Sequence, residues 1–250
     1  MLKLMKYEFK KQAFSKLVIV ALIGLFEIAF FYGVIRDSQN IIAGVMTFLF
    51  LFTMGALFYL AFEAIITYSN DLKQKCSYML FLTPNTSYSI VGAKVLTAGI
   101  QIVLAGLAFF ALFVIDGGVL IAKYDSIANL KKIILEFLDH FLSLKIQFSD
   151  LLATVIVIIA GWISIITLGF FSITLSTTFL ANKKYKGIVS FIIFIGLNYL
   201  YNKVSHLILG DTTDLTNVGT TFMWQTVITV VFIILTYFGT AWMLEKKVSV

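Results

Sequence analysis

The sequence predicts an all-α integral membrane protein with six transmembrane helices. Apolar residues make up 60% of its 250 residues and charged residues 13%, whereas soluble domains average roughly 45–50% and about 25%. The charges gather in short clusters. The apolar runs between them reach about 20 residues, enough to cross a hydrocarbon core about 30 Å thick. A water-soluble fold has too little interior to bury so much apolar surface.

Hydropathy and turn-forming residues delimit the spans. Short polar breaks such as RDSQN, NKKYK and GDTTDLTN interrupt the apolar runs, and breaks of this composition are typical of loops. With residues 1–250 forming a single transmembrane domain, the predicted spans are Leu17–Ile35, Ile41–Tyr68, Ser89–Ile115, Leu151–Leu180, Gly187–Leu209 and Thr221–Leu244.

Two amphipathic helices are predicted outside these spans. Residues 1–16 alternate apolar and Lys positions at helical spacing, which predicts a helix lying along the cytoplasmic membrane surface. Residues 116–148, between the third and fourth spans, contain IANLKKIILEFLDHFLSLKIQF. Charges recur there every three or four positions, so we expect an interfacial helix on the outer side rather than a seventh span.

Charge distribution predicts the orientation. The chain carries a net charge of +6, and its Lys residues flank the apolar spans, where basic residues orient helices and contact anionic lipid heads. A cytoplasmic N-terminus puts the Lys clusters of residues 3–16, 73–75, 183–186 and 246–247 inside, and leaves only Arg36 in the two short outer loops. Both termini are therefore expected in the cytoplasm of a cell whose plasma membrane holds the protein. No free basic helix suggests nucleic-acid binding.

Catalytic and metal-binding motifs are missing from the sequence. It has no HExxH, GxSxG, CxxC or phosphate-loop pattern, and two His with one Cys supply a transition-metal site poorly. We therefore expect no enzyme activity, no catalytic residues, no metal site and no cofactor in this chain.

Ionisable residues inside the spans are the first candidates for a translocation pathway, because such groups usually face a cavity or a partner. Glu27 lies near the middle of the first span, where a cavity-facing role and a structural hydrogen bond are equally open. Glu63 lies toward the inner end of the second span, where a structural role is favoured. Lys94 could pair with Glu63 or extend to the lipid heads.

The fifth span adds a polar face to these candidates. Asn198, Asn202 and His206 recur every four residues and so share one side of a helix. This face could line an aqueous path, but hydrogen bonding between helices near the outer interface is the preferred interpretation.

A cytoplasmic segment, residues 69–88, follows the second span. Alternating charges at Asp71, Lys73 and Lys75 lead into an apolar patch, Met79–Leu82, and the single proline, Pro84, then breaks the helix. This pattern predicts a short helix outside the membrane that presents a charged edge and an apolar face to a partner.

These parts, in this order, resemble the ABC-2 type permease family, the membrane subunits of ATP-driven exporters. The resemblance covers the basic start MLKLMKYEFKK, the six spans, the stretch NDLKQKCSYMLFLTPNTSYSIVGAKVL and the basic C-terminus. It implies that a separate ATPase docks against the segment after the second span and against the N-terminal helix. The implied coupling residues are Asp71, Leu72, Lys73, Gln74, Lys75, Ser77, Tyr78, Met79 and Phe81, with Tyr7, Glu8 and Lys11 beside the same partner.

The resemblance also implies what the chain works with. ATP and Mg²⁺ belong to the partner ATPase, a second permease copy or a paralogue completes a dimeric pathway, and the exported substrate is an amphipathic or antimicrobial peptide. The outer segment, residues 116–148, is longer than the family's minimal plan. A substrate-binding membrane subunit of an ATP-driven uptake system and a secondary transporter remain alternatives, although no inverted repeat is visible.

Overall fold

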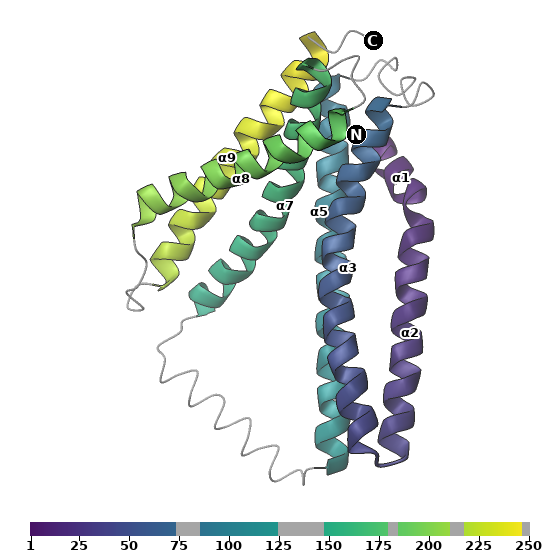
Figure 1. Cartoon of the computed structure of the whole chain (residues 1–250). Helices are drawn as coiled ribbons and strands as arrows, with labels where there is room; N and C mark the ends of the chain where they lie inside the picture. The colour runs from purple at the N-terminus through teal and green to yellow at the C-terminus, as the bar shows by residue number, and fades with distance from the viewer. Residues whose placement is uncertain (74–85, 125–147, 180–184, 211–217, 247–250) are drawn as a thin grey trace. The chain divides into compact units, whose positions relative to one another are not determined.

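The computed structural model describes residues 1–73, 86–124, 148–179, 185–210 and 218–246 (Figure 1). All regular structure in these ranges is α-helix, and six of the helices are long and apolar enough to cross a membrane. Apart from the short helix α1, each helix matches one predicted span. The helices are α1 (Leu2–Lys11), α2 (Ala13–Ile35), α3 (Gln39–Lys73), α5 (Ser87–Tyr124), α7 (Phe148–Phe179), α8 (Lys186–Leu209) and α9 (Val218–Lys246).

The largest difference from the predicted bounds is at the end of α5. The predicted span stops at Ile115, before the polar Asp116, whereas the helix continues to Tyr124. The sequence after Asp116, GGVLIA, is again apolar, so the carboxyl group does not end the helix. The helix therefore extends into the segment 116–148, which is expected outside the membrane. The helix predicted over its amphipathic stretch and the one predicted at Met79–Leu82 lie outside the described residues.

The N-terminal segment forms two helices rather than one continuous helix over residues 1–16. Helix α1 ends at Lys11, and α2 begins at Ala13. Gln12 between them has φ −101° and ψ 7°, and its side-chain oxygen accepts a hydrogen bond from Lys16 Nζ at 2.9 Å. Lys3, Lys6 and Lys10 of α1 are exposed, as expected for an amphipathic helix.

The chain divides into two compact units, although the sequence suggests a single transmembrane domain. Unit 1 comprises Met1–Glu8, Leu60–Ile102 and Phe148–Val250, and unit 2 comprises Phe9–Tyr59 and Val103–Gln147. Helices α1, α3 and α5 contribute residues to both units, so neither unit corresponds to an unbroken piece of the sequence. This division is invisible to hydropathy, which registers the spans but not their partners.

In unit 1, α7 packs against α8 and α9, and α8 lies beside α9 (Figure 1). Tyr68 of α3 is fully buried, stacks on Phe170 with ring centroids 4.2 Å apart, and its hydroxyl lies 2.6 Å from Thr174 Oγ1. Ser176 of α7 and Ser190 of α8 are joined by their hydroxyls at 2.5 Å. Hydroxyl groups thus join neighbouring helices where small side chains allow close approach.

Unit 2 is built on the α2–α3 hairpin and the second half of α5. Asp37 adopts a left-handed conformation with φ 54° in the turn between α2 and α3, a conformation that Asp tolerates better than most residues. Phe30, Val34 and Ile42 form a buried apolar cluster near this turn. Val45, Met46, Val119 and Leu120 pack against the cluster.

Candidate functional site

Three charged side chains meet in the interior of unit 1. Lys94 Nζ donates to Glu8 Oε1 and to Asp71 Oδ2, and both distances are 2.5 Å. The residues are only 5%, 3% and 2% exposed, respectively. We call Glu8, Lys94 and Asp71 the ion cluster.

The ion cluster joins three segments that are distant in the sequence. Glu8 lies on α1, Asp71 lies two residues before the end of α3, and Lys94 lies in the second turn of α5. Residues 74–85 connect α3 to α5. The two flanks of this connecting segment are therefore tied to each other and to the N-terminal helix by one lysine.

Neighbouring contacts support the start of α5 on its other sides. The hydroxyl of Tyr237, on α9, donates to the backbone oxygen of Tyr88 at 2.8 Å. Met1 packs over Gly92 so closely that a Cβ there would lie 2.6 Å from the methionine Cε. Gly92 thus permits the N-terminus to approach α5, close to Lys94.

The ion cluster changes the roles expected for two of its members. Glu8 and Asp71 are predicted to present charge to an ATPase, and Lys94 is predicted to pair with Glu63 or to reach lipid heads. In the structure Glu8 and Asp71 face inward to Lys94 instead, because a buried ammonium group requires compensating carboxylates. In the structure, both carboxylates therefore already contact an ammonium group.

The other implied coupling residues differ in accessibility. Tyr7 is 56% exposed, and Lys11 is also exposed. Leu72 is half-buried, at the edge of the ion cluster. The side chains of Lys73, Gln74, Lys75, Ser77, Tyr78, Met79 and Phe81 lie outside the described residues.

Unit 2 contains a second buried acidic site of a different kind. The carboxyl groups of Glu27 of α2 and Asp116 of α5 lie against each other, within reach of a hydrogen bond. Asp116 is 3% exposed, and Glu27 is half-buried. Glu27 Oε1 and Asp116 Oδ1 are buried atoms without a hydrogen-bond partner. We call these two residues the carboxyl pair. Its second member was not predicted as a site residue, because Asp116 marks the end of the span on hydropathy alone.

The remaining pathway candidates lie in unit 1. Glu63 is half-buried on α3. Asn198 donates to the backbone oxygen of Phe194 on its own helix, at 3.3 Å, and Asn202 and His206 are exposed on α8. The two exposed side chains on α8 are therefore accessible to a lipid, a partner or solvent.

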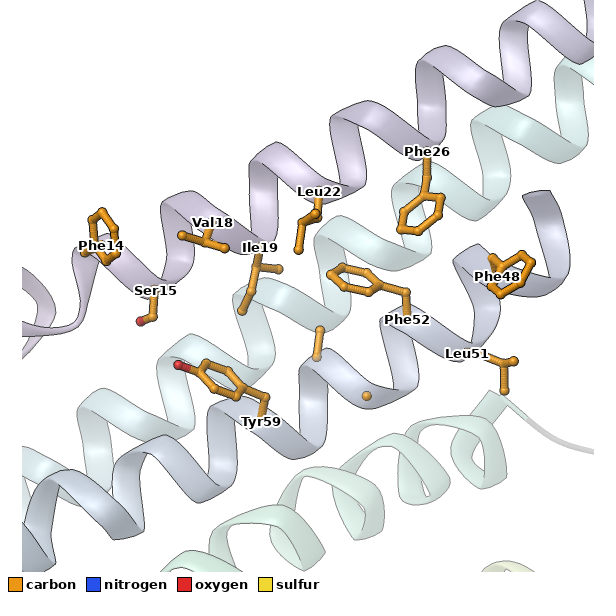
Figure 2. A pocket seen from close by; sticks show the side chains of 12 residues that line it. Phe14, Ser15, Val18, Ile19, Leu22, Phe26, Phe48, Leu51, Phe52 and Tyr59 are labelled. Atoms are coloured by element: carbon orange, nitrogen blue, oxygen red, sulfur yellow. The ribbon is translucent and has the colours of Figure 1, made fainter. Parts of the chain in front are cut away.

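An apolar groove of about 740 Å³ runs between α2 and α3 of unit 2. Figure 2 shows its aromatic rings converging from both helices, and Phe26 and Phe52 meet with centroids 5.6 Å apart. Hydroxyl groups enter only at one end, from Ser15 and Tyr59 (Figure 2). The other lining residues are Phe14, Val18, Ile19, Leu22, Phe48, Leu51, Gly55 and Ala56.

The turn between α2 and α3 carries an exposed ion pair. Lys123 Nζ lies 2.5 Å from Asp37 Oδ1 and also donates to the backbone oxygen of Val34, while the Tyr124 hydroxyl lies 3.2 Å from the same Asp37 oxygen. The Lys123 ammonium holds the pKa of the Asp37 carboxyl below its usual value, mainly by its hydrogen bond. This contact connects the end of α5 to the turn.

Neither a group of metal ligands nor a comparison with known proteins assigns a role to these sites. Across the described ranges, no three His, Cys, Asp or Glu side chains gather as a metal site would require. No family model, curated protein or solved structure matches the chain. The six apolar helices define the class of protein as a multi-pass helical membrane protein.

Proposed function

We propose that this protein is the permease subunit of an ATP-driven exporter of the ABC-2 type, which forms a translocation pathway and is driven by a separate ATPase. The observation that carries the proposal is the ion cluster. Asp71 and Lys94 flank the connecting segment 74–85, and both are fixed to Glu8 of α1. A force applied to that segment or to α1 would be passed directly to α3 and α5.

The energetics of the ion cluster favour a mechanical role over a purely stabilising one. Burying a salt bridge often gives no more stability than an apolar contact of the same volume, whereas removing one partner costs several kcal/mol. Three buried charges that join three segments therefore contribute mainly to a defined geometry. We propose that this geometry couples the partner ATPase to the spans, and that Tyr7 and Lys11, which are exposed on α1, contact the ATPase beside residues 72–81.

The apolar groove supports the proposed substrate class. An amphipathic peptide has one apolar face, and a groove lined by aromatic rings with hydroxyls at one end could receive that face from within the membrane. In this proposal two permease copies, or this chain and a paralogue, enclose the pathway in the plasma membrane. Both termini lie in the cytoplasm, and ATP and Mg²⁺ bind to the partner alone.

A reconstitution experiment tests the proposal. The full-length chain is placed in liposomes alone, and also together with any phosphate-loop ATPase that co-purifies with it, and movement of a fluorescent amphipathic peptide is measured. We expect movement only with the partner and with ATP. A matched pair of variants, Glu8→Gln and Lys3→Gln, separates the ion cluster from surface charge on α1. The first should reduce peptide-stimulated ATP hydrolysis and the second should not.

A secondary transporter is the second candidate, and the carboxyl pair favours it. Buried carboxyl groups in membrane spans commonly belong to proton pathways. Peptide movement by the chain alone, driven by a proton gradient and abolished by Glu27→Gln, would replace the first proposal with this one.

A further inference from the structure

Glu27 of the carboxyl pair lies far from both ends of α2. Glu27 is eight residues before the end of α2 at Ile35 and fourteen residues after its start at Ala13, which correspond to about 12 Å and about 21 Å of helix. In a hydrocarbon core about 30 Å thick, neither end of the helix brings the carboxyl group to the membrane surface. Asp116 shares this depth because its carboxyl group contacts that of Glu27.

Two carboxyl groups in contact need a proton before they can hydrogen-bond to each other. An ionised carboxylate only accepts hydrogen bonds, so one member of the pair must be the acid that donates to the other. Two carboxylates in contact would repel each other, and charge is strongly disfavoured away from water. The buried and unpartnered Oδ1 of Asp116, on a side chain only 3% exposed, indicates that the site is not already satisfied by protein donors.

The described neighbours of the carboxyl pair supply no positive charge. On α2, Lys16 is eleven residues before Glu27 and Arg36 is nine residues after it, so that each is at least about 13 Å away along the helix. On α5, Lys123 is held by Asp37. The part of α3 that belongs to unit 2 has no ionisable residue before Tyr59. This contrasts with Glu8 and Asp71, which have a lysine between them.

We propose that Glu27 and Asp116 form a proton-binding site within the membrane, in which a single proton is shared between the two carboxyl groups. A proton is favoured over a metal ion because a hard cation such as Ca²⁺ takes six to eight oxygen ligands, and the described residues offer no third acidic or His ligand there. The inference does not depend on whether an ATPase drives transport.

Infrared spectroscopy of the full-length protein in lipid vesicles tests the proposal without measuring transport. The carbonyl stretch of a protonated carboxyl group is separate from that of an ionised group and shifts in heavy water. At neutral pH we expect one such band in the wild type. Because the proton is shared, Glu27→Gln and Asp116→Asn should each shift or remove the band, since each changes one of the two groups that the proton joins. Glu63→Gln, on α3 of unit 1, is the matched control and should retain it.

Each other outcome contradicts the proposal. A wild-type spectrum without the band would show that both carboxyl groups are ionised. A change of the band in only one of the two variants would assign the proton to one residue alone, and an unshifted band of full intensity in both would place it elsewhere. Retained helix content, measured by circular dichroism on the same vesicles, distinguishes loss of the proton from loss of the fold.

Discussion

The two units bury acidic residues in opposite ways. In unit 1, Glu8 and Asp71 are both within 2.5 Å of the Lys94 ammonium. In unit 2, the carboxyl groups of Glu27 and Asp116 contact each other, with no ammonium or guanidinium group near them among the described residues. The same residue type therefore lies beside a cation at one site and beside a second carboxyl group at the other.

This difference shows that buried carboxyl groups can be stabilised in more than one way within one membrane protein. A buried charge must be paired, hydrogen-bonded or neutralised. The ion cluster solves the problem by pairing, which joins three segments and resists change. In the proposal above, the carboxyl pair solves it by binding a proton, and loss of that proton would restore the charge. The first arrangement suits a mechanical connection, and the second suits a site that responds to its surroundings.

Among the substitutions that test this difference, Lys94→Met is expected to have the largest effect on the free energy of unfolding. It removes the only described cation of the ion cluster and leaves two buried carboxylates side by side. Removing one partner of a buried pair typically costs about 3–5 kcal/mol, so the free energy of unfolding in detergent micelles should fall by that amount. Lys203→Met, at an exposed position on α8, is the control and should change it by less than about 0.5 kcal/mol. Equal effects would mean that Lys94 is not compensating the carboxylates.

A smaller effect is expected from Glu27→Gln, which keeps the shape of the side chain in the carboxyl pair. Since the pair already carries a proton, an amide donor replaces an acid donor, and the free energy of unfolding at neutral pH should change by no more than about 1 kcal/mol. The same unfolding assay measures it. A loss as large as that of Lys94→Met would show that Glu27 is ionised and paired with a cation.

The smallest effect is expected at the exposed Asp37–Lys123 pair. The folded-state pKa of Asp37 is lowered, so its contribution to stability is present above the pKa of an unfolded Asp, about 3.9, and is lost as the pH falls through the folded-state pKa. Asp37→Asn should be slightly less stable than the wild type at neutral pH and equally stable in strong acid. Unfolding curves at a series of pH values measure this difference, and a difference that grows on acidification would reverse the assigned sign.

Much of the fold follows from the sequence because hydropathy responds to lipid. The first and fifth spans end where predicted, at Ile35 and Leu209, because a polar segment or a glycine follows a long apolar run. The third span is longer than predicted. Asp116 is tolerated inside α5 because Glu27 meets it, and a hydropathy profile contains no information about such a partner.

The candidate sites were less predictable for the same reason. Glu8, Asp71 and Lys94 are individually visible as charges near span ends, but their contact joins residues 86 positions apart, and helical periodicity extends over only a few turns. The exposure of α1 was predicted from its alternating Lys residues, whereas the inward turn of Glu8 depends on Lys94. Sequence reasoning identified the residues that carry charge and missed how they pair.

The most direct test of the ion cluster is a double-mutant cycle between Glu8 and Lys94. The free energies of unfolding are measured for the wild type, Glu8→Gln, Lys94→Met and the double variant under the same conditions. A direct buried contact predicts a coupling energy of at least about 1 kcal/mol, because either substitution alone already removes the interaction between Glu8 and Lys94. Effects that add to within about 0.3 kcal/mol would contradict the contact and, with it, the proposed coupling of α1 to α3 and α5.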